Sequence, residues 1–264
     1  MAGPQATQIQ TRKDTPTTQA FQEGLEKAHQ FGLQVLVMPL ITLNSAPGWA
    51  GNIFFSSEGQ ARAWFASYWQ ALQPYVRILA QEQGEMFSLG SEYDRLQDES
   101  PDQWKLLIQN IRKIFSGKLI YSMNWDSFVK PLPSWVKYLN TIGCSAYFSV
   151  TKTPQRLTAQ QAVKLWKSNV QSSLDHIARR VGKPIVITEI GYRSGPTAGY
   201  LPYVGERKEP QDEQEQAILF DAALQNLSTD RHVNGIFWWA WSTPPFSPNG
   251  KAAAQVLARW FLYL

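Results

Sequence analysis

Short apolar runs alternate with longer amphipathic stretches along the whole chain. Runs of strand length lie at residues 32–41, 85–92, 118–125, 141–148, 183–192 and 233–242. Between them, apolar side chains recur every three or four residues, which predicts helices at residues 15–31, 57–84, 100–116, 133–140, 158–181, 212–227 and 251–264. Several runs are apolar on both faces, so both faces must be covered, as helices cover parallel strands. The pattern predicts an α/β fold.

Prolines and small polar residues refine these boundaries. Ser100 with Pro101 starts the third helical stretch, since proline fits the first helical turn. Pro74 falls inside the second helical stretch, where it is expected to end or kink the helix because it lacks an N–H group. Residues 6–10, ATQIQ, predict a weaker seventh strand.

Alternating strands and helices form either an open doubly wound sheet or a closed barrel. A dinucleotide-binding open sheet carries GxGxxG after its first strand, and the sequence contains no such motif. A (β/α)8 barrel of the TIM type needs about 250 residues. The 264 residues therefore predict one such barrel as a single domain over residues 1–264.

Composition and charge exclude several classes of protein. Hydrophobic residues make up 44% of the chain, enough to bury a full core, which excludes a disordered protein. The net charge of +4 comes from scattered lysines and arginines, so we expect no nucleic-acid partner. Neither a signal peptide nor a membrane span is recognisable, which predicts a cytoplasmic protein without membrane contact; secretion stays open if a preceding segment exists. We also expect a monomer.

Two glutamates end apolar runs, at the position where reacting groups lie in an α/β barrel. Glu92 closes the run at 85–92, and Glu189 lies near the end of the run at 183–192. Burying a carboxylate beside an apolar strand costs free energy, so such a group is usually paired with a cation or has a function. Two carboxylates suit glycoside hydrolysis, in which one protonates the leaving oxygen and the other attacks the anomeric carbon. The alternative is that each glutamate is a structural ion-pair partner.

Aromatic residues gather at the same strand ends and in the loops that follow. This group consists of Trp49, Trp125, Tyr147, Tyr192, Trp239 and Trp241. Flat apolar rings with a polar edge suit sugar rings, which have C–H patches and a rim of hydroxyls. Trp239 and Trp241 share the parity of one strand and would face the same way. If that face lines the lumen, Trp241 forms the floor of a sugar subsite.

Other catalytic constellations are not supported. His29, His176 and His232 lie on or beside predicted helices without metal-ligand spacing, so we expect no metal site. The sequence has no GxSxG motif, and the SxxK match at residues 149–152 lacks its companion motifs. Cys144 lies alone in an apolar run, as a buried structural thiol does. We expect no cofactor.

Five strings at the strand ends resemble those of glycoside hydrolase family 113, in the same order and spacing. They are MFSLGSE, LIYSMNWD, IGCSAYF, ITEIGYRS and GIFWWAWS. The resemblance runs from about residue 15 to the C-terminus. It implies a clan A retaining hydrolase on a TIM barrel, with endo-β-1,4-mannanase as the main characterised activity and an oligo- or polysaccharide as substrate.

The resemblance also assigns roles to residues. In clan A the acid/base glutamate ends strand four and the nucleophile ends strand seven, which implies Glu92 as the acid/base and Glu189 as the nucleophile. Two further apolar runs lie between them, as this numbering requires. The implied substrate contacts are Trp49, Ser91, Asn124, Trp125, Tyr147, Tyr192, Trp239 and Trp241. A retaining enzyme holds its two carboxyl groups about 5–5.5 Å apart, and we predict that spacing here.

Two positions depart from the family pattern. Ser91 precedes Glu92, where clan A usually has an asparagine that holds the sugar 2-hydroxyl. The third strand ends with Met38, Pro39 and Leu40, where relatives often have Lys-Pro-His. These departures leave open a weakly active or inactive carbohydrate-binding barrel, or a glycosidase for another β-glycan. A phosphate-dependent enzyme on the same fold is a further alternative, but the loop after Gly191 is rich in proline and tyrosine.

The strand numbering predicts a short barrel. If Glu92 ends strand four, residues 32–41 form strand three and residues 6–10 form strand two. A βα unit takes roughly 30 residues or more. We therefore expect about seven strands and no first βα unit within residues 1–264.

Overall fold

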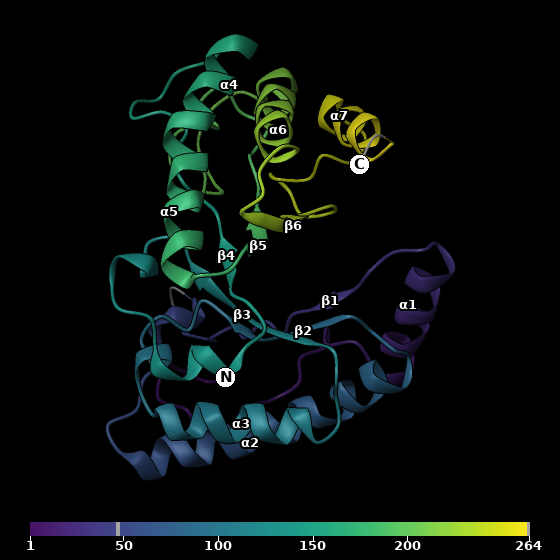
Figure 1. The fold of residues 1–264 in the computed structure, drawn as a ribbon, viewed down its shortest axis with the longest axis vertical. Helices are drawn as coiled ribbons and strands as arrows, with labels where there is room; N and C mark the ends of the chain where they lie inside the picture. The colour runs from purple at the N-terminus through teal and green to yellow at the C-terminus, as the bar shows by residue number, and fades with distance from the viewer. Residues whose placement is uncertain (46–47, 263–264) are drawn as a thin grey trace. The chain divides into compact units, whose positions relative to one another are not determined.

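The computed structural model describes residues 1–45 and 48–262 and divides into two compact units, Met1–Ile142 and Gly143–Leu264 (Figure 1). Each unit contains three parallel strands that follow one another in chain order. The first unit holds β1 (Leu36–Val37), β2 (Met86–Ser91) and β3 (Lys118–Asn124). The second holds β4 (Gly143–Ser145), β5 (Ile185–Ile190) and β6 (Val233–Trp238). Every predicted apolar run contributes one strand, so the parallel α/β pattern is confirmed.

Helices α1 (Thr18–Gln30), α2 (Glu58–Gln81) and α3 (Pro101–Arg112) belong to the first unit. In Figure 1, α2 and α3 lie side by side along the strands of this unit. Short 3₁₀ helices follow the strands: η1 (Ala50–Asn52), η2 (Leu96–Asp98), η3 (Ser127–Val129) and η4 (Ser134–Tyr138). The predicted helix at 133–140 is therefore a 3₁₀ helix.

Helix α2 continues through Pro74, so the helix does not end at this residue. The Ser57 hydroxyl caps the helix by accepting a hydrogen bond from the Gln60 N–H. Residues on both sides of Pro74 are buried, among them Leu72, Val76 and Leu79. Burial of this apolar face on either side of Pro74 outweighs the backbone hydrogen bond that proline cannot make.

Six large aromatic side chains form the centre of the first unit. This aromatic cluster consists of Trp64, Tyr68, Tyr93, Trp104, Tyr121 and Trp135, all at most 1% exposed. Trp104 stacks on Trp135 with ring centroids 4.5 Å apart, and Trp64 stacks on Tyr68 at 4.7 Å. The cluster joins α2 and α3 to the ends of β2 and β3.

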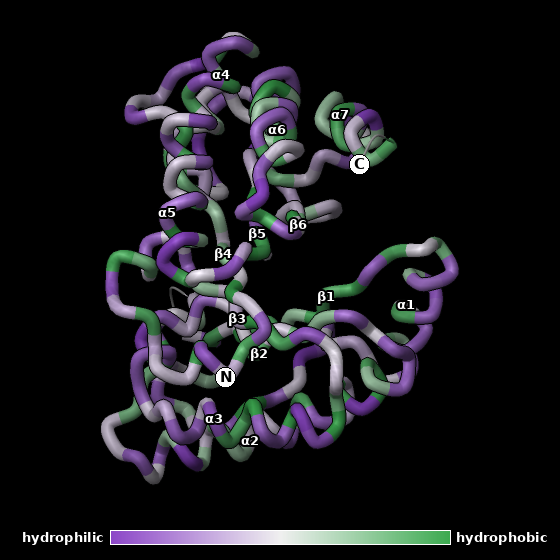
Figure 2. The backbone as a smooth tube through the Cα atoms, in the orientation of Figure 1, coloured by the Kyte–Doolittle hydropathy of each residue, from purple (hydrophilic) through white to green (hydrophobic). Residues whose placement is uncertain are grey.

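Helices α4 (Ala159–Trp166), α5 (Ser172–Val181), α6 (Glu213–Leu227) and α7 (Ala252–Phe261) belong to the second unit. A π-helical turn, Lys167–Gln171, separates α4 from α5 within the single helix predicted at 158–181. Thr158 and Gln161 form a capping box at the start of α4. In Figure 2 the helices alternate between hydrophobic and hydrophilic colours, whereas β5 is largely hydrophobic, and all six of its residues are buried.

Residues 1–14, all of which the structure describes, form no strand, so the strand predicted at 6–10 is wrong. Instead, the Ile9 N–H donates a hydrogen bond to the Ser67 hydroxyl, 2.9 Å away on α2. This backbone N–H thus bonds to a side chain of a helix and not to a neighbouring strand. The alternation of residues along 6–10 does not predict such a contact. Among the described residues, no helix combines the length and apolar character required to cross a membrane.

Candidate active site

Glu92 directly follows β2 in a backbone conformation that is unusual for this residue type. Its φ angle is +56°, in the left-handed region, and its N–H donates to the Ser122 carbonyl at 2.9 Å. Its Oε2 accepts a hydrogen bond from the Trp49 indole N–H at 3.0 Å. A non-glycine residue in this region persists only when its surroundings fix it, and such residues gather at functional sites. Trp49 and Glu92, both predicted site residues, therefore come together.

The aromatic cluster fixes the turn that carries Glu92. The Tyr93 N–H donates to the Tyr121 hydroxyl at 2.8 Å, and the Tyr68 hydroxyl donates to the Leu89 carbonyl at 2.9 Å. Gly90 has a φ of +157°, and a Cβ there would lie 2.4 Å from the Tyr93 ring. Burial raises the pKa of Tyr68, Tyr93 and Tyr121, so these hydroxyls stay neutral. They orient the strand end by hydrogen bonding alone.

Ser91 and Asn124 are the last residues of β2 and β3. Ser91 is buried, whereas Asn124 and the adjacent Trp125 are half-buried. The Asn124 side-chain amide donates to Asp94 Oδ2 at 3.4 Å. Asp94 is a carboxyl group at the strand end that the sequence reasoning missed. Its position two residues after Glu92 was the available signal.

Glu189 lies within β5 and is only 8% exposed. Its Oε2 accepts a hydrogen bond from the Tyr147 hydroxyl at 3.2 Å, and its carbonyl accepts one from the Ala146 N–H at 2.6 Å. Tyr147 is also 8% exposed, and its ring packs edge-on against Phe246. The structure thus brings together the predicted nucleophile and the tyrosine that was expected near it.

Glu92 belongs to the first unit and Glu189 to the second. Their predicted separation of about 5–5.5 Å therefore stays a prediction.

Trp239 and Trp241 lie beyond the end of β6, which stops at Trp238. The Trp239 N–H donates to the Ile190 carbonyl at 2.8 Å, whereas Trp241 is 57% exposed. Because Trp239 and Trp241 lie outside the strand, the alternation of side chains along β6 does not show that the two rings face the same way. Trp241 lines an apolar pocket of about 270 Å³, together with Trp238 and residues from the α7 region.

Tyr192 is buried away from solvent and does not fit the role of a sugar contact. It is 1% exposed, and its hydroxyl accepts a hydrogen bond from the Trp166 indole N–H at 2.8 Å. Its ring packs edge-on against Phe220 of α6. Tyr192 therefore packs α4 and α6 against the end of β5, and its aromatic character reflects core packing.

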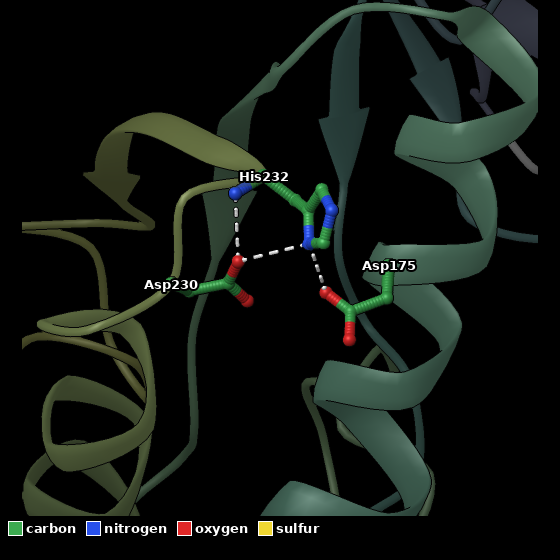
Figure 3. Close-up of side chains that lie close together, drawn as sticks. All are labelled: Asp175, Asp230 and His232. Carbon is green, nitrogen blue, oxygen red and sulfur yellow. Dashed lines mark hydrogen bonds and ion pairs between the residues drawn. The ribbon is translucent and has the colours of Figure 1, made fainter.

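His232 approaches two carboxylates that are distant in sequence (Figure 3). Its Nδ1 lies 2.8 Å from Asp175 Oδ1 of α5 and 3.4 Å from Asp230 Oδ1. The ligand atoms of all three residues lie within 4.8 Å of one another, which satisfies the spacing of a metal site. Asp230 also accepts hydrogen bonds from the His232 N–H and from Gln171. These contacts explain why the three side chains lie together: they connect α5 to the start of β6.

The model of glycoside hydrolase family 113 matches residues 1–257. The chain belongs to glycoside hydrolase family 113. The five strand-end motifs indicated this family, and that prediction is confirmed. As a family 113 protein it is a glycoside hydrolase. A search of curated protein sequences finds no significant match.

Solved structures of family 113 share the fold over the whole chain. A GH113 β-1,4-mannanase is 20% identical with a TM-score of 0.82, covering 100% of this chain and 85% of its own. The GH113 β-mannanase AaManA from Alicyclobacillus acidocaldarius, in complex with ManMIm, is 23% identical with a TM-score of 0.81. The match covers 100% of this chain and 84% of the mannanase chain. A β-glucuronidase from an uncultured Clostridium sp. is 18% identical with a TM-score of 0.63. The match covers 91% of this chain and 42% of the glucuronidase chain. The predicted TIM-barrel type of fold is thus confirmed.

Proposed function

We propose that this family 113 protein is a retaining β-1,4-mannan hydrolase that works by double displacement, with Glu189 as the nucleophile and Glu92 as the acid/base. One observation carries the proposal. Each of the two strand-end glutamates accepts a hydrogen bond from an aromatic side chain, Glu92 from Trp49 and Glu189 from Tyr147. The mannanases with the same fold support mannan as the substrate.

In the first step, ionised Glu189 attacks the anomeric carbon while protonated Glu92 gives its proton to the leaving oxygen. The Tyr147 hydroxyl donates to one oxygen of Glu189, which holds the carboxylate in one orientation. In the second step, Glu92 takes a proton from the water that hydrolyses the glycosyl-enzyme ester. The Trp49 indole keeps the carboxyl group of Glu92 oriented through both steps.

Two amide variants tested on two substrates distinguish these roles. Glu92→Gln should lower kcat on mannan by about 10²–10⁴-fold, because the leaving oxygen loses its proton donor. With an aryl β-mannoside, whose leaving group departs without protonation, the first step should stay fast and glycosyl-enzyme should accumulate as a burst. Glu189→Gln should lose activity on both substrates.

Glu213→Gln is the matched control, since Glu213 lies exposed in the first turn of α6. It should retain the activity of the parent chain. The absence of a burst with the aryl β-mannoside for Glu92→Gln, or an active Glu189→Gln, would contradict the assigned roles.

A carbohydrate-binding protein without catalysis is the second candidate. It is favoured by Met38 and Leu40, which put apolar side chains where relatives often carry a lysine and a histidine; Leu40 is 56% exposed. Binding of mannooligosaccharide by calorimetry, without release of reducing ends, would support this candidate over the hydrolase.

A further inference from the structure

The Phe246 ring lies against the tyrosine that donates to the proposed nucleophile. It packs edge-on against Tyr147 with ring centroids 6.4 Å apart, and Phe246 is buried. Two glycines of the loop after β5, residues 191–212, approach the same ring. A Cβ on Gly191 would lie 3.2 Å from its Cδ1, and a Cβ on Gly205 would lie 3.3 Å from its Cε2. The loop therefore confines the Phe246 ring against Tyr147.

Arg193 holds the part of this loop that contains Gly205. Its guanidinium donates to the Val204 carbonyl at 3.3 Å and to the Thr197 carbonyl at 2.8 Å. Its Nε donates to Glu209 Oε1 at 2.7 Å. The Thr197 hydroxyl donates to the other oxygen of Glu209 at 2.6 Å. One buried side chain thus connects three separate positions of the loop, and one of them directly precedes Gly205.

Arg193 and Glu209 form a buried ion pair, with side chains 3% and 14% exposed. Burial by itself raises the pKa of Glu209, but the hydrogen bonds from Thr197 and Arg193 help to lower it below its ordinary value, so Glu209 stays ionised. Gly195 permits this arrangement, since a Cβ there would lie 2.2 Å from Glu209 Oε1. A buried pair with these additional hydrogen bonds has a fixed geometry, unlike an exposed pair.

Resting on the proposed function, we propose that Arg193 is a positioning residue for the nucleophile, Glu189. By binding the carbonyl that precedes Gly205, Arg193 keeps this glycine packed on Phe246. Phe246 in turn keeps the Tyr147 ring in place, so that its hydroxyl donates to Glu189 at 3.2 Å. All these residues belong to the second unit. Weakening any of these contacts should displace the Tyr147 hydroxyl without removing it.

The variant Arg193→Lys keeps a positive charge beside Glu209 but loses the planar fork that binds the carboxylate and the loop carbonyls together. We expect kcat on mannan to fall by about 3- to 10-fold with little change in KM, because the nucleophile is less well oriented. In a Tyr147→Phe background the same substitution should change kcat by less than about twofold, because the hydroxyl that it positions is already absent. Losses that multiply in the double variant, or a change confined to KM, would contradict the proposal.

A second measurement reads the position of Tyr147 without catalysis. Tyrosines labelled with ¹³C at the ring carbons beside the hydroxyl give ¹H–¹³C signals, and the signal lost in Tyr147→Phe belongs to this residue. In Arg193→Lys the Tyr147 signal should shift or broaden. Gly205→Ala leaves Arg193 intact and adds a methyl group whose nearest contact is the Phe246 ring. It should therefore move the same signal, and it tests the proposal even if Arg193→Lys does not fold.

Arg259→Lys provides the matched control. Arg259 also pairs with a carboxylate at 2.7 Å, that of Asp221, but its side chain is exposed on the surface of the same unit. This variant should leave both kcat and the Tyr147 signal unchanged. A Tyr147 signal that matches the parent in folded Arg193→Lys, or in Gly205→Ala, would overturn the inference. If no hydrolysis is detected for the parent chain, the proposed function fails, while the Tyr147 signal still decides whether Arg193 positions this tyrosine.

Discussion

Each of the two glutamates accepts a hydrogen bond from an aromatic side chain. Glu92 accepts from Trp49 at 3.0 Å, and Glu189 accepts from Tyr147 at 3.2 Å. A hydrogen bond to a charged group contributes about 1.5–3 kcal/mol. These contacts are therefore large enough to affect the orientation of the carboxyl groups.

Tyr147→Phe removes the hydroxyl that donates to Glu189 and keeps the ring that packs on Phe246. We expect kcat to fall by about 10- to 100-fold, which corresponds to the loss of a hydrogen bond to a charged group. KM should change little if the bond matters mainly in the transition state. Steady-state kinetics on mannan give both constants. Tyr138→Phe, an exposed tyrosine on η4, should match the parent, and an unchanged kcat in Tyr147→Phe would contradict the positioning role.

The sequence alone predicted Glu92, Glu189, Trp49 and Tyr147 as site residues, because polar or aromatic residues at strand ends stand out against apolar runs. Asp94 could not be identified in this way. Its environment depends on Asn124 and Ser127, which come from β3 and the helix after it. Burial and unpaired oxygen atoms are properties of tertiary packing, and no local pattern records them.

At the scale of elements, the end of β5 and the segment after β6 approach each other closely at Gly191. The Trp239 N–H donates to the Ile190 carbonyl at 2.8 Å. A Cβ on Gly191 would lie 2.1 Å from the Trp239 carbonyl oxygen, which is a backbone atom and cannot rotate away. Glycine at this position therefore permits the approach of two backbones directly after β5.

Gly191→Ala should destabilise the fold by about 1–3 kcal/mol, because the backbones must separate to admit the methyl group. Urea denaturation followed by circular dichroism measures the change in the free energy of unfolding. Gly24→Ala serves as the opposite control, since a Cβ at Gly24 in α1 meets nothing within 4 Å. It should stabilise the chain by up to about 1 kcal/mol through helix propensity. Equal effects of the two substitutions would contradict the argument.

Apolar runs located all six strands of the described part of the chain, since a buried parallel strand needs little else to be recognised. The apolar runs predicted the lengths of the strands less well: β1 covers only Leu36–Val37 of the run at 32–41. The continuation of α2 through Pro74 depends on buried contacts along the helix. Such contacts override local propensity, and the sequence pattern does not contain them.

For the whole molecule, buried carboxyl groups make stability depend on pH. Glu215 of α6 is 1% exposed and accepts hydrogen bonds from the Leu157 N–H at 3.1 and 3.3 Å. Burial raises its pKa to about 7, against an ordinary value of 4.5, and the charge of Asp212 adds to the shift. The folded state thus binds this proton more tightly than the unfolded state. The resulting stability is fully present below about pH 4.5 and is lost as the pH rises through about 7.

Glu215→Gln removes this ionisation and keeps an oxygen that can accept from Leu157. Between pH 4.5 and 7, the free energy of unfolding of the parent should therefore fall relative to that of the variant, by about 1–3 kcal/mol. Urea denaturation at a series of pH values measures the difference. The exposed Glu213→Gln should run parallel to the parent chain. A constant difference between parent and Glu215→Gln across this range would show that Glu215 does not carry the effect.

The stereochemistry of the first product tests the central claim most directly. Hydrolysis of a mannooligosaccharide is followed by ¹H NMR from the earliest time points, before the anomers equilibrate. Double displacement through Glu189 and Glu92 predicts that the β-anomer forms first and that the α-anomer appears later by mutarotation. Formation of the α-anomer first would show a single displacement and would contradict the account.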